Sequence, residues 1–249
     1  MAEILIETCC ASLEDALISA EVGIKRIELN SALPLGGLSP SVSLLEEIKT
    51  KTDLEVMVML RPREGGMCYS DYEFKQMLLD LPKFLQAGAD GIVFGILTPE
   101  ATIDLERTEQ ILNQLEGRAA VFHRAFDLLP NQEEGLHTLI ELGFERILTS
   151  GGRSTVPQGK EALVRLHQLA QDRITILPGG GLRSHNLLAF LKNTQFKEVH
   201  YTPRLPQYDL SASFNREINF GLAGLDETQI IGKIDKETLN NSIRQLSYF

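Results

Sequence analysis

The chain has 249 residues, of which 43% are hydrophobic and 23% are charged, so it has enough apolar material for a full core. Its 24 Lys and Arg against 34 Asp and Glu residues give a formal charge of −10, which disfavours nucleic acid or an anionic membrane as partner. Because the sequence lacks an apolar stretch of membrane-spanning length and a basic leader at Met1, it predicts a cytoplasmic protein with reduced cysteines.

Eight short apolar runs, each followed by a helical pattern, have the length and composition of buried strands. The predicted strands cover residues 4–7, 25–29, 55–60, 91–94, 119–123, 146–148, 174–177 and 197–201. Ser12 is expected to cap the first helix, and Pro40 is expected in the first turn of the second. Ser70 and Glu73 form a capping box for the third helix, which Pro82 is expected to kink or split.

One sequence pattern recurs along the chain: a helical stretch, a glycine and then a short apolar run. The glycines are Gly23, Gly88 and Gly143, about two strand–helix units apart. Glycine suits the left-handed residue that closes a helix, so each copy predicts a helix end that leads into a strand.

Strands that alternate with helices over short connections require a parallel sheet, and eight such units fit a closed barrel better than an open sheet. The sequence therefore predicts the α/β class, with residues 1–249 forming a single (β/α)8 TIM barrel. An open doubly wound sheet is the alternative, but no predicted strand leads into a G-x-G-x-x-G turn. A long loop over residues 202–234 precedes a last helix capped by Asp235, and this loop is a candidate lid.

Polar side chains stand at the carboxyl ends of the predicted strands, where such barrels bind their ligands. The predicted catalytic residues are Glu7, Glu28, His123 and Asp127, and the predicted ligand-binding residues are Arg61, Arg63, Arg124, Ser150, Gly151, Gly152, Gly179, Gly180, Gly181 and His200. Salt bridges that seal the barrel would explain any one of these charges. So many charged groups in one mouth are costly unless they hold a ligand, and the combination favours a functional site.

Two glycine runs, Gly151-Gly152 and Gly179 to Gly181, follow the sixth and seventh strands. The second run leads into a helix whose N-terminal N–H groups attract anions, and barrels often hold phosphate near their last two strands. Tight turns between strand and helix explain the glycines equally well. We expect a small anionic ligand here.

Two interpretations of a metal site compete. A hard divalent ion would prefer the predicted catalytic residues, whereas cuprous copper would prefer sulfur, meaning the cysteines and Met57, Met59 or Met67. Cys9 and Cys10 are adjacent on an extended chain, so their side chains should point to opposite sides. Met57 and Met59 are typical of core filler.

Eight motifs, taken in chain order, resemble those of the CutC family. They are Glu7-Thr8-Cys9, Arg26-Ile27-Glu28-Leu29, GGLSPS from Gly36 to Ser41, Arg61-Pro62-Arg63, Leu97-Thr98-Pro99-Glu100, FHRAFD from Phe122 to Asp127, LTSGG from Leu148 to Gly152, and PGGG from Pro178 to Gly181. The resemblance implies a (β/α)8 barrel and a cytoplasmic copper-homeostasis protein, often dimeric, without a settled enzymatic reaction. Copper is the metal that it implies, with Cys9 as a ligand, and a homodimer is the implied assembly.

Two positions depart from the family pattern. Many members carry a cysteine directly after the Arg-Ile-Glu-Leu motif, and proposals for cuprous copper pair it with the cysteine of the first strand, whereas this chain has Asn30. After the eighth strand, the segment from His200 to Arg204 replaces a His-Gly-Ser-Ala-Arg type sequence. Because Cys9 keeps only half of the thiol pair, we expect no tight cuprous site.

Three functions follow as alternatives. The resemblance implies a role in copper homeostasis. The residues themselves also fit an enzyme that acts on a small anionic or phosphorylated metabolite, with His123 or Glu28 as general acid or base and Arg61 and Arg63 neutralising the substrate. A non-catalytic scaffold that works through a dimer surface is the third, and the sequence leaves open whether the protein is an enzyme.

Overall fold

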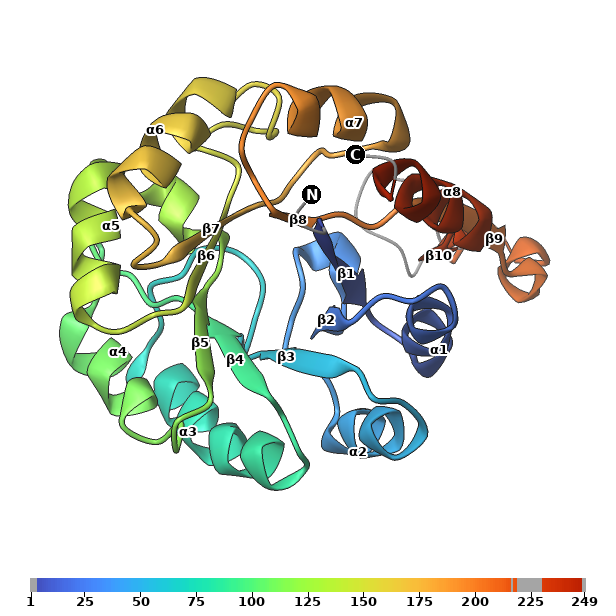
Figure 1. The fold of residues 1–249 in the computed structure, drawn as a ribbon. Helices are drawn as coiled ribbons and strands as arrows, with labels where there is room; N and C mark the ends of the chain where they lie inside the picture. The colour runs from blue at the N-terminus through green and yellow to red at the C-terminus, as the bar shows by residue number, and fades with distance from the viewer. Residues whose placement is uncertain (1–3, 216, 219–229, 248–249) are drawn as a thin grey trace.

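The computed structural model describes residues 4–215, 217–218 and 230–247, in which eight parallel strands form a ring (Figure 1). The strands are β1 (Leu5–Cys10), β2 (Arg26–Leu29), β3 (Glu55–Met59), β4 (Gly91–Phe94), β5 (Ala119–Phe122), β6 (Arg146–Thr149), β7 (Thr175–Pro178) and β8 (Glu198–His200). They pair in the order β7-β6-β5-β4-β3-β2-β1-β8, and a parallel bridge between Gly179 and His200 joins the two outer strands. The predicted (β/α)8 barrel is confirmed.

Helices cover the outside of the ring (Figure 1). They are α1 (Leu13–Glu21), α2 (Val42–Lys51), α3 (Asp71–Gln86), α4 (Leu105–Leu112), α5 (Gln132–Glu141), α6 (Lys160–Ala170), α7 (Ser184–Lys192) and α8 (Lys236–Leu246), with short 3-10 turns η1 (Leu33–Leu35), η2 (Arg124–Leu128) and η3 (Leu210–Ser213). Because α1 to α7 each lie between two consecutive strands and α8 follows the last strand of the ring, the eight parallel strands bring their carboxyl ends to one mouth.

The helix boundaries follow the predicted capping chemistry. The Ser12 hydroxyl accepts the Asp15 N–H, Ser70 and Glu73 form a capping box, and Asp235 caps α8. The three repeated glycines adopt left-handed φ angles of 90°, 93° and 81° directly after the ends of α1, α3 and α5. The recurring sequence pattern is therefore a helix end followed by a buried strand, as predicted.

The prediction that Pro40 lies in the first helical turn was wrong, and so was the predicted split of the third helix at Pro82. The helix α2 begins at Val42 behind the N-cap Ser41, so Pro40 lies before the helix. Pro82 lies inside α3, which runs unbroken to Gln86. Pro82 removes one backbone donor, but the buried neighbours Leu81 and Phe84 hold this end of the helix against the barrel.

The segment predicted as a loop over residues 202–234 contains an antiparallel pair, β9 (Arg204–Tyr208) and β10 (Ile230–Ile234). Residues 216 and 219–229 of this segment lie outside the described part. The ribbon of β9 and β10 is held by buried Asp15 of α1, whose carboxylate accepts the Ile234 N–H and pairs with Arg204 at 3.1 Å. This tie between distant segments explains why the ribbon is ordered where the sequence indicated a loop.

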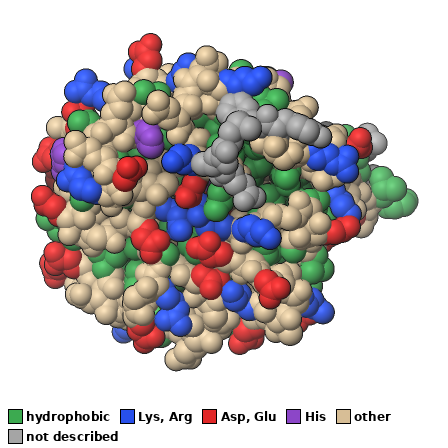
Figure 2. Space-filling model, in the orientation of Figure 1, with side chains coloured by type: hydrophobic (Ala, Val, Ile, Leu, Met, Phe, Trp, Pro, Cys, Tyr) green, Lys and Arg blue, Asp and Glu red, His purple; other side chains and the backbone are tan. Residues whose placement is uncertain are grey.

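The surface is mixed in charge. Figure 2 shows acidic and basic side chains interleaved over one face of the molecule, with hydrophobic groups at the tip where β9 and η3 project. Tyr208 and Phe214 are exposed in that projecting part. Among the described residues, no helix combines the length and the apolar character needed to cross a membrane.

Candidate functional site

A cavity of about 240 Å³ lies at the carboxyl ends of the strands. Its lining residues are Cys9, Glu28, Asn30, Leu33, Gly36, Gly37, Met59, Arg61, Met67, His123, Arg124, Leu148, Gly179, Gly180 and His200. Eight of the fifteen predicted catalytic, ligand-binding and metal-binding residues are in this set. The barrel interior beneath is filled by Met57 and Met59 with Val93, Ala119 and Val121, so the two methionines are core residues, as expected, and Met59 also reaches the cavity.

One wall of the cavity carries three groups that can hold a metal ion. Cys9 stands opposite Glu28 in the register of β1 and β2, and His200 ends the neighbouring strand β8. One ligand atom from each lies within 4.8 Å of the others. Cys10 points away from this wall, since its sulfur contacts the Ser19 hydroxyl of α1 at 3.6 Å. The prediction that the side chains of the two adjacent cysteines point to opposite sides is confirmed.

Glu7 does not line the cavity but positions a residue that does. Its carboxylate accepts from Arg26 Nε at 2.6 Å and contacts His200 Nδ1 at 2.9 Å. Burial acts to raise the pKa of Glu7, but the His200 hydrogen bond and the Arg26 charge outweigh it and lower the pKa to about 2. Glu7 is thus a permanent anion that directs His200 Nε2 away from itself, the arrangement that orients imidazole ligands in metal sites.

Asn30 bridges the two other groups on this wall. Its Nδ2 donates to Glu28 Oε1 at 2.8 Å and to Cys9 Sγ at 3.3 Å. Burial raises the pKa of Glu28, and it raises the pKa of the Cys9 thiol well above 9.0. Burial acts to lower the pKa of His200, but Glu28 and Glu7 reverse this and raise it. From the sequence, Asn30 is recognised only as a departure from the family pattern, and its place between Cys9 and Glu28 was not predicted.

Arg61 lies on another wall and is almost completely buried. Its Nη1 donates to the carbonyls of Leu35 and Gly37, and its Nη2 donates to Gly65, so the guanidinium organises the loops after β2 and β3. Within the described residues no carboxylate pairs with it, and its Nε has no acceptor.

His123 is buried at the end of β5 as the N-cap of η2. Its Nδ1 accepts the backbone N–H of Ala125 at 3.1 Å, which assigns the ring proton to Nε2. Burial and then the Arg61 charge lower the pKa of His123 to about 3. The imidazole is therefore neutral at physiological pH, and a role as a positively charged general acid does not fit it.

Asp127 departs from its predicted position in the cavity. Its carboxylate accepts the backbone N–H groups of Ser150 and Gly152 and the Thr149 hydroxyl, and it pairs with Arg124 at 2.7 Å. The loop after β6 was expected to bind an external anion, but the chain's own carboxylate fills it. The N–H groups of Gly151 and Gly152 already have acceptors within the chain, so this loop does not offer them to an external anion.

Replacing Asp127 with Asn tests this internal anion. The variant is expected to lose about 1–3 kcal/mol of stability in urea unfolding, because an amide nitrogen would face N–H donors that now meet oxygen. The amide hydrogens of Ser150 and Gly152 should exchange faster. Asp80→Asn on the surface of α3 is the control, and equal losses in both variants would contradict the assignment.

Several other predicted ligand-binding residues lie outside the cavity. Arg63 pairs with Glu73 at 2.6 Å and donates to three loop carbonyls, so its guanidinium is already occupied. Ser150 and Gly181 are not among the lining residues. The glycine run after β7 does reach the cavity through Gly179 and Gly180.

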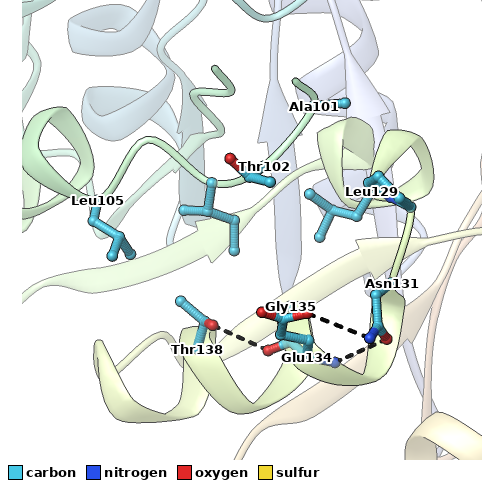
Figure 3. A pocket seen from close by; sticks show the side chains of 10 residues that line it. Ala101, Thr102, Leu105, Leu129, Asn131, Glu134, Gly135 and Thr138 are labelled. Carbon is cyan, nitrogen blue, oxygen red and sulfur yellow. Dashed lines mark hydrogen bonds between the residues drawn. The ribbon is translucent and has the colours of Figure 1, made fainter. Parts of the chain in front are cut away.

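A second cavity of about 310 Å³ lies outside the barrel, between the loop before α4 and the start of α5 (Figure 3). Its polar groups are already paired: Asn131 Oδ1 accepts the Glu134 N–H, and Asn131 Nδ2 contacts the Glu134 carboxylate at 3.3 Å. No predicted site residue lines it. The mouth cavity is therefore the stronger candidate for function.

Comparisons with known proteins agree on one family. The model of the CutC family matches residues 4–204. A protein named as a CutC family member from Treponema denticola is 42% identical, and the match covers 93% of this chain and 99% of that protein. The human copper homeostasis protein cutC homolog is 40% identical, and the match covers 80% of this chain and 73% of the human protein. The crystal structure of a CutC protein from Streptococcus agalactiae is 34% identical, with a TM-score of 0.75 over 79% of this chain and 97% of that one.

Proposed function

The chain belongs to the CutC family, and from this membership we propose that it acts in copper homeostasis by binding a divalent metal ion at the mouth of its barrel. The observation that carries the proposal is the cluster of Cys9, Glu28 and His200, whose ligand atoms lie within 4.8 Å of one another. The human relative is named for copper homeostasis, which supports the choice of metal cargo.

The donor set favours a divalent ion over a cuprous one. On losing its proton to metal binding, Cys9 would supply a thiolate beside the Glu28 carboxylate and the His200 imidazole, a mixed sulfur, oxygen and nitrogen set, whereas Cu(I) prefers sulfur ligands. Asn30 supplies an amide where a second thiol would be needed, and its Nδ2 already donates to Cys9 Sγ. Three protein ligands leave a fourth position open, which suits an ion that is delivered and released or that meets a second molecule.

The residues around the cluster prepare it for an ion. Glu7 holds His200 through Nδ1, which leaves Nε2 for the metal. Glu28 Oε2 is buried without a partner, so an ion would satisfy an oxygen that the described residues leave unpaired. Arg204 donates to the Cys9 carbonyl at 2.7 Å and fixes the end of β1.

Metal titration tests the proposal. Calorimetry under anaerobic conditions should find one Zn²⁺ or Cu²⁺ site per chain. Cys9→Ser and His200→Ala should abolish tight binding, and Glu7→Gln should weaken it by about 10–100-fold through loss of the His200 partner. Cu(I), presented with a competing chelator, should find no tight site.

Cys68→Ser is the matched control, because Cys68 is an exposed thiol that does not line the cavity. Its affinity should equal that of the unmodified protein. Tight one-to-one Cu(I) binding that Cys9→Ser removes would contradict the divalent assignment.

The homodimer implied by the family stays a prediction, which a solution mass of twice 27.7 kDa would support.

A further inference from the structure

Unpaired polar atoms are concentrated in the mouth cavity. Among the described residues, five buried side-chain atoms lack a hydrogen-bond partner, and four of them belong to residues that line it: Glu28 Oε2, Asn30 Oδ1, Arg61 Nε and His123 Nε2. Buried polar groups are nearly always paired in native proteins, so such a cluster indicates a missing ligand. Two of these atoms are hydrogen-bond acceptors and two are donors, so a ligand of this cavity needs both donor and acceptor groups.

Arg61 and His123, which carry the two unpaired donors and are called the donor wall below, suit an anionic group. Arg61 is a buried cation without a carboxylate partner in the described chain, and a buried charge of this kind needs a counter-charge. His123 presents Nε2–H as a neutral donor, because its Nδ1 is fixed as the acceptor of the Ala125 N–H. Two N–H donors, one of them charged, suit the two oxygens of a carboxylate.

Two further donors lie on the rim. Arg124 uses Nε for Asp127 and Nη2 for Ser150, which leaves Nη1 without a partner among the described residues. Gly180 also lines the cavity, and its backbone N–H meets no acceptor in the described chain. Two further N–H donors thus line the same cavity, and its size of about 240 Å³ restricts the ligand to a small metabolite.

Glu28 and Asn30, which carry the two unpaired acceptors and form the acceptor wall, require hydrogen-bond donors on the same ligand. Glu28 Oε2 and Asn30 Oδ1 accept hydrogen bonds and would repel a second anionic group. Hydroxyl groups can donate to such oxygens without adding charge. A ligand with a carboxylate at one end and hydroxyls at the other satisfies both walls.

We propose that the mouth cavity binds a small hydroxylated carboxylate, with its carboxylate on Arg61 and His123 and its hydroxyls toward Glu28 and Asn30. The carboxylate contacts come from β3 and β5, whereas the proposed metal ligands come from β1, β2 and β8. Glu28 belongs to both proposals, but the carboxylate contacts on Arg61 and His123 do not involve the metal ligands, so carboxylate recognition can be tested without an ion.

The test uses the full-length chain in a chelating buffer with three matched probes. Glycerate carries a carboxylate and two hydroxyls, propionate lacks the hydroxyls, and glycerol lacks the carboxylate. Glycerate should raise the melting temperature most and bind at least tenfold more tightly than either partial probe. Inorganic phosphate is a fourth probe, and stronger stabilisation by phosphate would overturn the assignment to a carboxylate.

Variants locate the site. Arg61→Met and His123→Phe should each raise the glycerate dissociation constant at least tenfold, as expected when a charged or buried hydrogen-bond donor is lost. Arg61 also holds loop carbonyls, so His123→Phe keeps the test valid if Arg61→Met does not fold. Arg63→Gln is the control from the same loop, and it should leave the constant unchanged. The proposal fails if no probe stabilises the protein or if Arg63→Gln weakens binding as much as the cavity variants do.

Discussion

Between about pH 7.5 and 4.5 the protein is expected to lose about 3 kcal/mol of stability through His123 alone. Burial and the Arg61 charge lower the pKa of this imidazole from 6.5 to about 3 in the folded state. As the pH falls below 6.5, the unfolded chain takes up the proton and the folded chain does not. Stability is therefore full above about pH 6.5 and falls as the pH approaches 3.

Urea unfolding at a series of pH values measures this loss. His123→Asn removes the titrating group while its Oδ1 can still accept the Ala125 N–H, so the variant's stability should fall about 3 kcal/mol less over the same range. Glu28 acts in the opposite direction, because its raised pKa favours the folded state on acidification, so only the difference between the two proteins isolates His123. His137→Asn, at an exposed position of α5, is the control. If the free energy of unfolding fell equally with pH in the unmodified protein and in His123→Asn, the assignment of a buried neutral imidazole would be refuted.

Most of the fold was predictable because its signals are local. Gly23, Gly88 and Gly143 mark helix ends through a conformation that other residues adopt reluctantly, and the short apolar runs behind them have the length and composition of buried strands. The ribbon of β9 and β10 was missed because its two strands pair across a long stretch of sequence. Its attachment to Asp15 of α1 is also a contact between distant segments. No local pattern encodes such pairing.

The site was predictable in part, because residues at the carboxyl ends of parallel strands must share one mouth. This rule found Glu28, Arg61, His123 and His200, which all line the cavity. It could not tell that Asp127 fills the loop after β6, since an internal carboxylate and an external anion satisfy the same N–H groups. It also failed for Arg63, because Glu73 and three loop carbonyls hold its guanidinium outside the cavity.

The largest loss of stability is expected for Arg26→Met. Arg26 and Glu7 form an ion pair at 2.6 Å with both side chains 2% exposed, and Arg26 also pairs with Glu198 at 2.6 Å. Removing one partner leaves a carboxylate in the barrel interior with only His200 beside it, which costs about 3–5 kcal/mol in comparable buried pairs. Urea unfolding followed by circular dichroism measures the loss.

A double variant separates charge from packing. If the uncompensated Glu7 charge causes the loss, Glu7→Gln combined with Arg26→Met should be more stable than Arg26→Met alone, because no buried charge is left unpaired. Arg165→Ala breaks the exposed pair with Glu133, whose side chains are 69% and 42% exposed, and should change stability by less than about 1 kcal/mol. A double variant no more stable than Arg26→Met would assign the loss to packing. In the outcome expected here, the double variant would keep its fold yet bind metal more weakly, because Glu7 is also the group that orients His200.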